Sequence, residues 1–288
     1  MKIGEILKDK KESISFEFFP PKTDTAERSL FETIDKLNAF NPTYVSMTYG
    51  AGGSTRDKTI RMVERLVHET ELTVMPHLTC INASQDDTRG ILDYYEKLGI
   101  ENILALRGDP PMGVTELPEI EDGFDYARDL IKFIKKDYDF SISAAVYPEG
   151  HHESPSIDMD MAYTKEKVEL GAEFLITQMF FDNDFFYAFL NRCEKLGIDV
   201  PIIPGMMIIT DLKKISQLSN MCGTSIPSKL GQLMEKYGEP TDDARKAGMD
   251  FTIEQCRDLK ANGVKYLHFY TLNKWEPVTE VINSLDLA

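Results

Sequence analysis

The feature that most constrains the fold of this chain is a regular alternation of short apolar segments with amphipathic ones. Eight apolar segments are rich in β-branched and aromatic residues, as is typical of strands. They cover residues 14–19, 43–49, 73–80, 102–107, 141–147, 174–180, 200–204 and 265–272. Most begin roughly 30 residues apart, the length of one strand, one helix and their turns. The alternation predicts parallel strands joined by right-handed helical crossovers.

The segments between these strands have the periodicity of helices. Apolar residues recur every three or four positions in SLFETIDKLNAF, KTIRMVERLVHET and DLIKFIKKDY, which gives each helix one apolar face. Gly99, Gly171, Gly197 and Gly263 each follow a helical pattern just before a strand, where a left-handed C-terminal cap favours glycine. Eight such repeats predict a closed (β/α)8 TIM barrel. No GxGxxG follows the first strand, which disfavours an open Rossmann sheet.

The interval between the seventh and eighth strands is longer than the others. It predicts an extra helix near residues 225–237, followed by a long helix over residues 241–261. Residues 116–123 are acidic and weakly periodic, and they predict an exposed loop. Because no low-complexity linker divides the chain, we expect residues 1–288 to form a single domain.

The composition excludes several classes of protein. A formal charge of −16 disfavours nucleic acid and anionic membranes as partners, since both require a positive surface. No long apolar run predicts a membrane span, and MKIGEILKDKKE lacks the apolar core of a secretory signal. The four cysteines lie far apart in the sequence, without metal-site or redox spacing. We therefore expect a cytoplasmic protein with reduced thiols.

Polar residues occur where the predicted strands end, which is where a TIM barrel carries its active site. They are Glu17, Thr48, Tyr49, His77, Thr79, Arg107, Asp109, Tyr147, Glu149, Gln178, His268 and Tyr270. An unpaired charge inside a barrel is costly, so polar groups at seven strand ends indicate a functional site. The residues alone support an enzyme with Glu17 as an internal acid, Asp109 as a second carboxylate and Arg107 as a basic neighbour. They leave cofactor and substrate open.

Two further motifs are weaker. The glycine-rich segment YGAGGS at residues 49–54 could cradle a phosphate with its backbone amides, although a flexible loop is the commoner meaning of such a sequence. His151 and His152 precede Asp158 and Asp160, a set of metal-ligating residue types. Adjacent histidines rarely point at one ion, and neither HxH nor HExxH accompanies them. We therefore predict no metal site.

Taken together, the strand-end motifs resemble those of the methylenetetrahydrofolate reductase family. The motifs are SFEFFPPK (15–22), VSMTYGAGGS (45–54), PHLTC (76–80), ALRGDPP (105–111), AAVYPEGH (144–151), ITQMFFD (176–182), PIIPGMM (201–207) and HFYTLN (268–273). They occur in order along nearly the whole chain, and FEFFPP and ALRGDPP are individually distinctive. The family is a flavin-dependent α/β barrel, which agrees with the fold inferred from the alternation.

The resemblance implies an oxidoreductase with non-covalently bound FAD. NADH or NADPH gives hydride to the flavin N5 and leaves; 5,10-methylenetetrahydrofolate then takes its place, accepts the hydride and becomes 5-methyltetrahydrofolate. Glu17 matches the general acid that helps open the five-membered ring, Asp109 a carboxylate that tunes the flavin and helps hold the folate, and Gln178 a folate contact. Positions matching flavin contacts are Thr48, His77, Arg107, Gly108, Asp109, Tyr147, His151, Asp160 and Lys167. The family also implies a homo-oligomer.

The chain departs from the family pattern at three positions. Lys214 and Leu218 stand where some bacterial relatives have glutamine and phenylalanine, and Lys274 follows HFYTLN where they have arginine. We expect Lys274 to lie at the mouth of the barrel and to contact the folate or the nicotinamide substrate. The chain ends soon after the last strand, so inhibition by S-adenosylmethionine is not expected.

Three alternatives stay open at this point. A proline dehydrogenase-like flavin barrel would reduce its flavin with an amino acid. A metal-dependent barrel hydrolase would use His77, His151 and the nearby aspartates. A folate-binding protein without turnover would have no need of the acid at Glu17.

Overall fold

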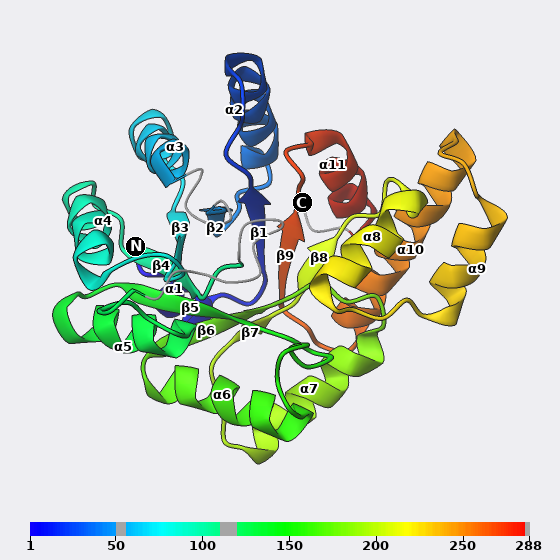
Figure 1. The fold of residues 1–288 in the computed structure, drawn as a ribbon. Coiled ribbons are helices and arrows are strands. Elements are labelled where there is room, and N and C mark those ends of the chain that lie inside the picture. The colour runs from blue at the N-terminus through cyan, green and yellow to red at the C-terminus, as the bar shows by residue number, and fades with distance from the viewer. Residues whose placement is uncertain (50–55, 110–119, 286–288) are drawn as a thin grey trace.

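The strands of the computed structural model form one parallel sheet wound into a barrel, with helices around its outside (Figure 1). The structure describes residues 1–49, 56–109 and 120–285. The strands are β1 (Ser13–Phe18), β2 (Tyr44–Met47), β3 (Val74–Thr79), β4 (Asn102–Leu106), β5 (Ser141–Val146), β6 (Ala172–Thr177), β7 (Ile202–Ile203), β8 (Gly205–Met207) and β9 (Tyr266–Tyr270). Their order in the sheet is β7-β6-β5-β4-β3-β2-β1-β9-β8.

The seventh barrel strand is divided at Pro204, and its two halves stand at the two ends of the sheet order. β7 pairs with β6, whereas β8 pairs with β9. Pro204 has no N–H to donate, but its carbonyl accepts a hydrogen bond from the His268 N–H at 3.0 Å. Since residues 202–207 run on continuously, the chain itself nearly closes the barrel. The predicted barrel is confirmed, and its seventh strand extends past the predicted end at residue 204.

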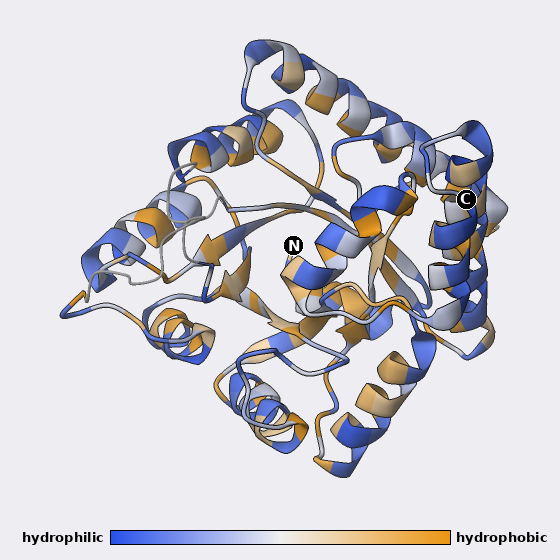
Figure 2. Ribbon diagram, turned by 45° about the vertical axis from the view of Figure 1, so that its right-hand side comes forward, coloured by the Kyte–Doolittle hydropathy of each residue, from blue (hydrophilic) through white to orange (hydrophobic). Residues whose placement is uncertain are grey.

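The helices present apolar faces to the strands and hydrophilic faces outward (Figure 2). They are α1 (Ile3–Asp9), α2 (Asp24–Asn38), α3 (Arg56–Glu69), α4 (Gln85–Lys97), α5 (Ala127–Asp137), α6 (Ile157–Glu169), α7 (Asn183–Lys195), α8 (Leu212–Cys222), α9 (Ser228–Lys236), α10 (Asp242–Ala261) and α11 (Trp275–Ser284). The four glycines predicted to cap helices have backbone φ angles of 78°, 122°, 68° and 82°, in the left-handed region. None of the described helices combines the length and apolarity needed to cross a membrane.

Helix α1 closes the N-terminal end of the barrel, and sequence analysis did not anticipate it. Its Ile3 and Leu7 are fully buried and share an apolar cluster with Tyr44 and Phe174 inside the barrel. The Ile3 N–H donates a 2.7 Å hydrogen bond to Asn102 Oδ1 at the start of β4. Because α1 fills the N-terminal end of the barrel, the C-terminal end remains open for a functional site.

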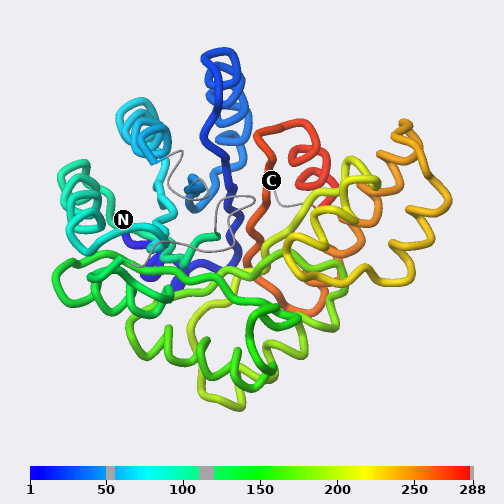
Figure 3. Tube along the Cα trace, viewed as in Figure 1, coloured from blue at the N-terminus to red at the C-terminus, as the bar shows by residue number. Residues whose placement is uncertain are grey.

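The long interval before β9 contains the predicted α9 and α10 and one further helix, α8. Figure 3 shows α8 and α9 beside α10 at one side of the barrel. The three helices share a second apolar cluster with Met207, the last residue of β8, and with Ile209, which follows it. The glycine-rich segment and most of the predicted loop at residues 116–123 lie outside the described residues.

The divided strand leads to a prediction about stability. A side chain at Gly205 would run into the Tyr270 hydroxyl and the Thr177 carbonyl, which are joined by a 2.6 Å hydrogen bond. We expect Gly205→Ala to lower the free energy of unfolding by about 1–3 kcal/mol, the usual cost of overpacking. Gly231→Ala in α9, where a Cβ meets open space, should instead stabilise by about 0.5–1 kcal/mol. Urea unfolding compares the two variants, and equal stability of Gly205→Ala and wild type would contradict the expectation.

Candidate active site

A buried carboxylate between two imidazoles occupies the C-terminal end of the barrel. Glu17 alternates along β1 with Phe16 and Phe18, which belong to the core outside the barrel, so it faces the interior. It is 8% exposed. Its Oε2 lies 3.4 Å from His77 Nε2 on β3 and 3.5 Å from His268 Nε2 on β9. Three strands thus bring together groups from distant parts of the sequence.

The electrostatics of this centre favour the ionised carboxylate. Burial raises the pKa of Glu17, but interaction with His268 and His77 outweighs it and lowers the pKa to about 2. Glu17 is therefore ionised at neutral pH in the ligand-free protein. To act as an acid it must first receive a proton.

His268 is a residue that sequence analysis noted at a strand end but to which it gave no role. Its ring is fully buried, with Nδ1 2.8 Å from Ser15 Oγ. The ring also stacks on Tyr44, with centroids 5.7 Å apart. These contacts fix the imidazole with Nε2 toward Glu17, and they depend on the register that pairs Ser15 with His268.

A cavity of about 320 Å³ opens at the ends of β4 and β5, at the same end of the barrel as this centre. Five of the predicted site residues line it: Arg107, Tyr147, His151, Asp160 and Lys167. Residues that sequence analysis missed are also in its wall: Tyr126, Arg128, Glu153, Ser154 and Tyr163. Tyr126 is the N-cap of α5, Arg128 lies in α5 and Tyr163 lies in α6. In the sequence, such residues are typical of a solvent-exposed helix surface.

Positive charge and aromatic rings characterise this cavity. Arg107 forms an ion pair with Glu153, which raises the pKa of the guanidinium. Lys167 Nζ donates a 2.9 Å hydrogen bond to the Ala145 carbonyl, and burial lowers its pKa. The Arg128 guanidinium lies 4.6 Å from the centre of the Tyr126 ring. A ligand with an anionic group and a flat ring would match this lining.

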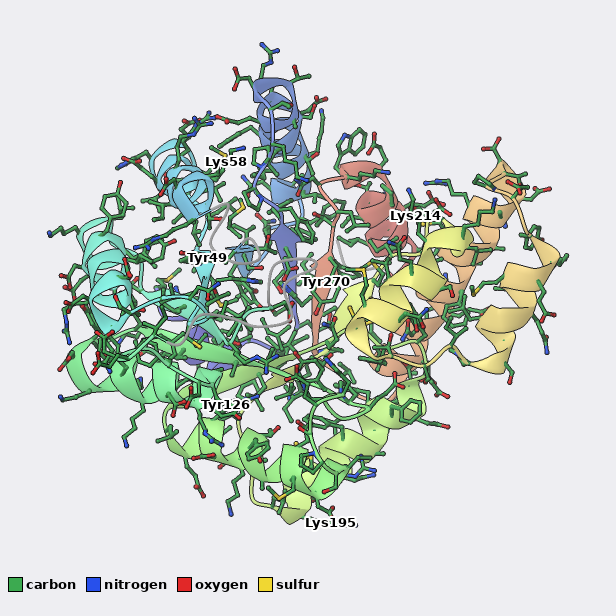
Figure 4. The ribbon with its side chains drawn as sticks, in the orientation of Figure 1. Tyr49, Lys58, Tyr126, Lys195, Lys214 and Tyr270 are labelled. Atoms are coloured by element: carbon green, nitrogen blue, oxygen red, sulfur yellow. The ribbon has the colours of Figure 1, made fainter. Side chains whose placement is uncertain are left out.

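Gly108 and Asp109 directly follow Arg107 in the cavity wall. Gly108 has a φ of 88°, and a side chain there would contact Ile81 and Thr79. Both the backbone conformation and the lack of space therefore favour glycine at this position. The negative charge of Asp109 adds to burial in raising the pKa of Tyr147. Tyr270, labelled at the centre of Figure 4, has its pKa raised by burial and then by the charge of Glu17.

The remaining predicted residues lie around the mouth of the barrel. Thr48 follows β2, and its N–H donates to the Phe18 carbonyl at 2.9 Å. Gln178 follows β6, and its Oε1 accepts from the Met179 N–H at 2.8 Å. Lys274 is exposed at the N-cap of α11. Lys214 lies on α8, away from Tyr270 in Figure 4, and pairs with Asp211 at 3.3 Å.

The metal-ligating residue types at the cavity do not converge. The rings of His151 and His152 stack on each other with centroids 4.6 Å apart. In the described part of the chain, no group of three His, Cys, Asp or Glu side chains is arranged to hold a metal ion.

The fold and the site define a class: an α/β-barrel protein with an enzyme-like centre, in which a buried carboxylate and a cavity lined by basic and aromatic side chains lie at the same end of the barrel. The family model described as methylenetetrahydrofolate reductase matches residues 2–286. The chain belongs to this family, as the strand-end motifs predicted.

Curated relatives agree with the family match. The chain is 37% identical over 297 residues to methylenetetrahydrofolate reductase (NADH) 1 of Arabidopsis thaliana, covering 99% of this chain and 50% of the relative. It is 38% identical over 273 residues to 5,10-methylenetetrahydrofolate reductase of Escherichia coli K12, covering 95% and 90%. The chain therefore spans about half the length of the plant relative and most of the bacterial one.

The fold also matches solved structures. A Clostridium thermocellum protein that binds two copies of 5-methyl-5,6,7,8-tetrahydrofolic acid aligns with a TM-score of 0.65, 14% identity, and coverage of 100% of this chain and 99% of that one. At this identity the likeness shows the barrel fold alone.

Proposed function

We propose that the chain is an FAD-dependent enzyme that reduces 5,10-methylenetetrahydrofolate to 5-methyltetrahydrofolate with NADH or NADPH, each substrate reacting in turn at one flavin face. The observation that carries this proposal is the position of Glu17, buried between His77 and His268 at the C-terminal strand ends. Family membership supports the reaction, residues 1–288 as one catalytic domain, a homo-oligomer and a cytoplasmic location.

The lining of the cavity suits the diphosphate and the aromatic rings of a flavin dinucleotide. Lys167 offers positive charge for a diphosphate, as do Arg107 and Arg128, which pair with Glu153 and Glu166 in the ligand-free protein. Cations paired with phosphate are the usual means of holding one. No carboxylate lies within ion-pair distance of Lys167 among the described residues, so an anionic ligand would satisfy a partly buried ammonium. Tyr126 and Tyr147 offer aromatic surface for the rings.

When bound, FAD would carry hydride between the two substrates, chemistry that no side chain provides. The chain's own residues supply position and protons. Glu17 delivers a proton to the folate nitrogen as the five-membered ring opens; the product keeps that proton, and a new one from solvent reprotonates the carboxylate, which His77 and His268 hold in place. Asp109 accepts hydrogen bonds from the pterin, while Gln178 and Lys274 hold the substrate at the mouth.

An anaerobic spectroscopic titration tests this proposal. We expect the protein to bind FAD, to lose its visible flavin absorbance on addition of NADH or NADPH, and to regain it on addition of methylenetetrahydrofolate. Proline in place of the nicotinamide should leave the flavin oxidised, which separates this enzyme from a proline dehydrogenase-like barrel. A folded protein that retains no FAD, or a reduced flavin that the folate does not reoxidise, would refute the function.

A further inference from the structure

The turn that follows β9 carries backbone strain at a leucine. Leu272 has a φ of 48° and Asn273 a φ of 57°. Asparagine enters the left-handed region readily, whereas a bulky side chain seldom does. Among the described residues, the other non-glycine positions with positive φ are all asparagines. Leu272 is therefore the exception.

Hydrogen bonds to β1 hold this turn in place. The Asn273 side chain satisfies both backbone groups of Phe19: Phe19 N–H donates to Oδ1, and Nδ2 donates to the Phe19 carbonyl, each at 2.9 Å. Thr271 Oγ1 donates to the Glu17 carbonyl at 2.7 Å. The turn is thus tied to the strand end that carries the buried carboxylate, through residues on either side of Leu272.

The fold makes little use of the Leu272 side chain itself. It is 41% exposed, and it belongs to none of the three apolar clusters. Glycine or asparagine would occupy the same backbone conformation with less strain. Backbone strain at a residue whose side chain adds little to packing is typical of positions that contact a ligand.

We propose that Leu272 is a substrate-contacting residue, whose side chain packs against the aromatic ring of the folate at the mouth of the barrel. This inference rests on the function proposed above. In methylenetetrahydrofolate, the nitrogen that Glu17 protonates carries an aminobenzoyl ring, so that ring must lie next to Glu17. Leu272 is presented by a turn bonded directly to the Glu17 backbone, and its apolar surface suits a flat ring.

Leu272→Asn tests the proposal, because asparagine keeps the turn and removes the apolar contact. We expect its melting temperature to equal or exceed that of wild type. Its KM for methylenetetrahydrofolate and its Kd for 5-methyltetrahydrofolate should rise about tenfold, as expected for one lost apolar contact. The KM for the nicotinamide should not change. Leu272→Met should restore folate binding, since methionine is also apolar and adapts to its surroundings.

Leu196→Asn is a matched control, because Leu196 is also an exposed leucine, at the end of α7. It should leave both substrates unaffected. An unchanged folate KM and Kd in Leu272→Asn, or an equal rise for the nicotinamide, would overturn the assignment. If the wild-type protein does not reduce methylenetetrahydrofolate, both the proposed function and the Leu272 contact are refuted. If wild type reduces it and Leu272→Asn binds folate equally well, the function stands and only the Leu272 contact is refuted.

Discussion

Glu17→Gln should slow the reduction of methylenetetrahydrofolate by about 10²–10⁴-fold, the usual contribution of a positioned general acid. Glutamine keeps the size of the side chain but cannot give up a proton to the folate nitrogen. Reduction of the flavin by NADH or NADPH needs no such proton, so its rate should stay near that of wild type. Stopped-flow absorbance follows each half-reaction separately.

Glu12→Gln is the matched control for this variant, since Glu12 is exposed just before the opposite end of β1. It should alter neither half-reaction. Equal slowing of both half-reactions in Glu17→Gln would remove Glu17 from the role of acid. Because the variant also deprives His77 and His268 of their anionic neighbour, its unfolding curve should be recorded to show that the barrel is intact.

Lys167→Met should weaken FAD binding by about 10- to 100-fold, the effect of losing one charge-assisted contact to a phosphate. In the flavin-free protein the same change should leave stability equal or higher. Burial lowers the pKa of Lys167, which means that its environment disfavours the charged form, and methionine fills similar volume without that cost. Fluorescence titration with FAD and thermal unfolding of the flavin-free protein give the two quantities.

Lys165→Met provides the control on the same helix, because Lys165 does not line the cavity and faces Glu169 at 3.7 Å. Its FAD affinity should match that of wild type. An unchanged Kd in Lys167→Met would show that this ammonium does not hold the flavin. A marked loss of stability without flavin would show instead that Lys167 serves the fold.

The barrel could be predicted from the sequence because its signal repeats. Strand after strand shows the same apolar composition and the same following helix, so an error at one repeat does not change the conclusion. Features that occur only once were missed: α1 is short, and the seventh strand is interrupted at Pro204 and resumes at Gly205, two residue types that are uncommon inside strands. The strand continues over Gly205–Met207 because these residues pair with β9. That pairing exists only when the barrel closes, so the local sequence does not predict it.

The site was predicted where residues directly follow strands and missed where contacts depend on register or on helix faces. Glu17, Arg107 and Asp109 stand at strand ends that the pattern locates. The contact between Ser15 and His268 joins residues far apart in the sequence, and no local pattern predicts it. Tyr163 shares α6 with Lys167, and nothing in the helical periodicity marks that face as the wall of a cavity.

The divided strand makes one seam of the barrel different from the rest. Here β7 is paired only with β6 and β8 only with β9, and side chains bridge the gap: Thr177 Oγ1 accepts from the Gly205 N–H at 3.0 Å, and the Tyr270 hydroxyl donates to the Thr177 carbonyl. In the C-terminal half of this seam, separating β6 from β8 breaks only these two side-chain hydrogen bonds, whereas separating two strands that are paired along their length breaks a backbone ladder. At the mouth of the barrel, β6 and β8 can therefore separate slightly without breaking a backbone ladder, and we expect the opening to adjust its width there, next to Gln178, which directly follows β6.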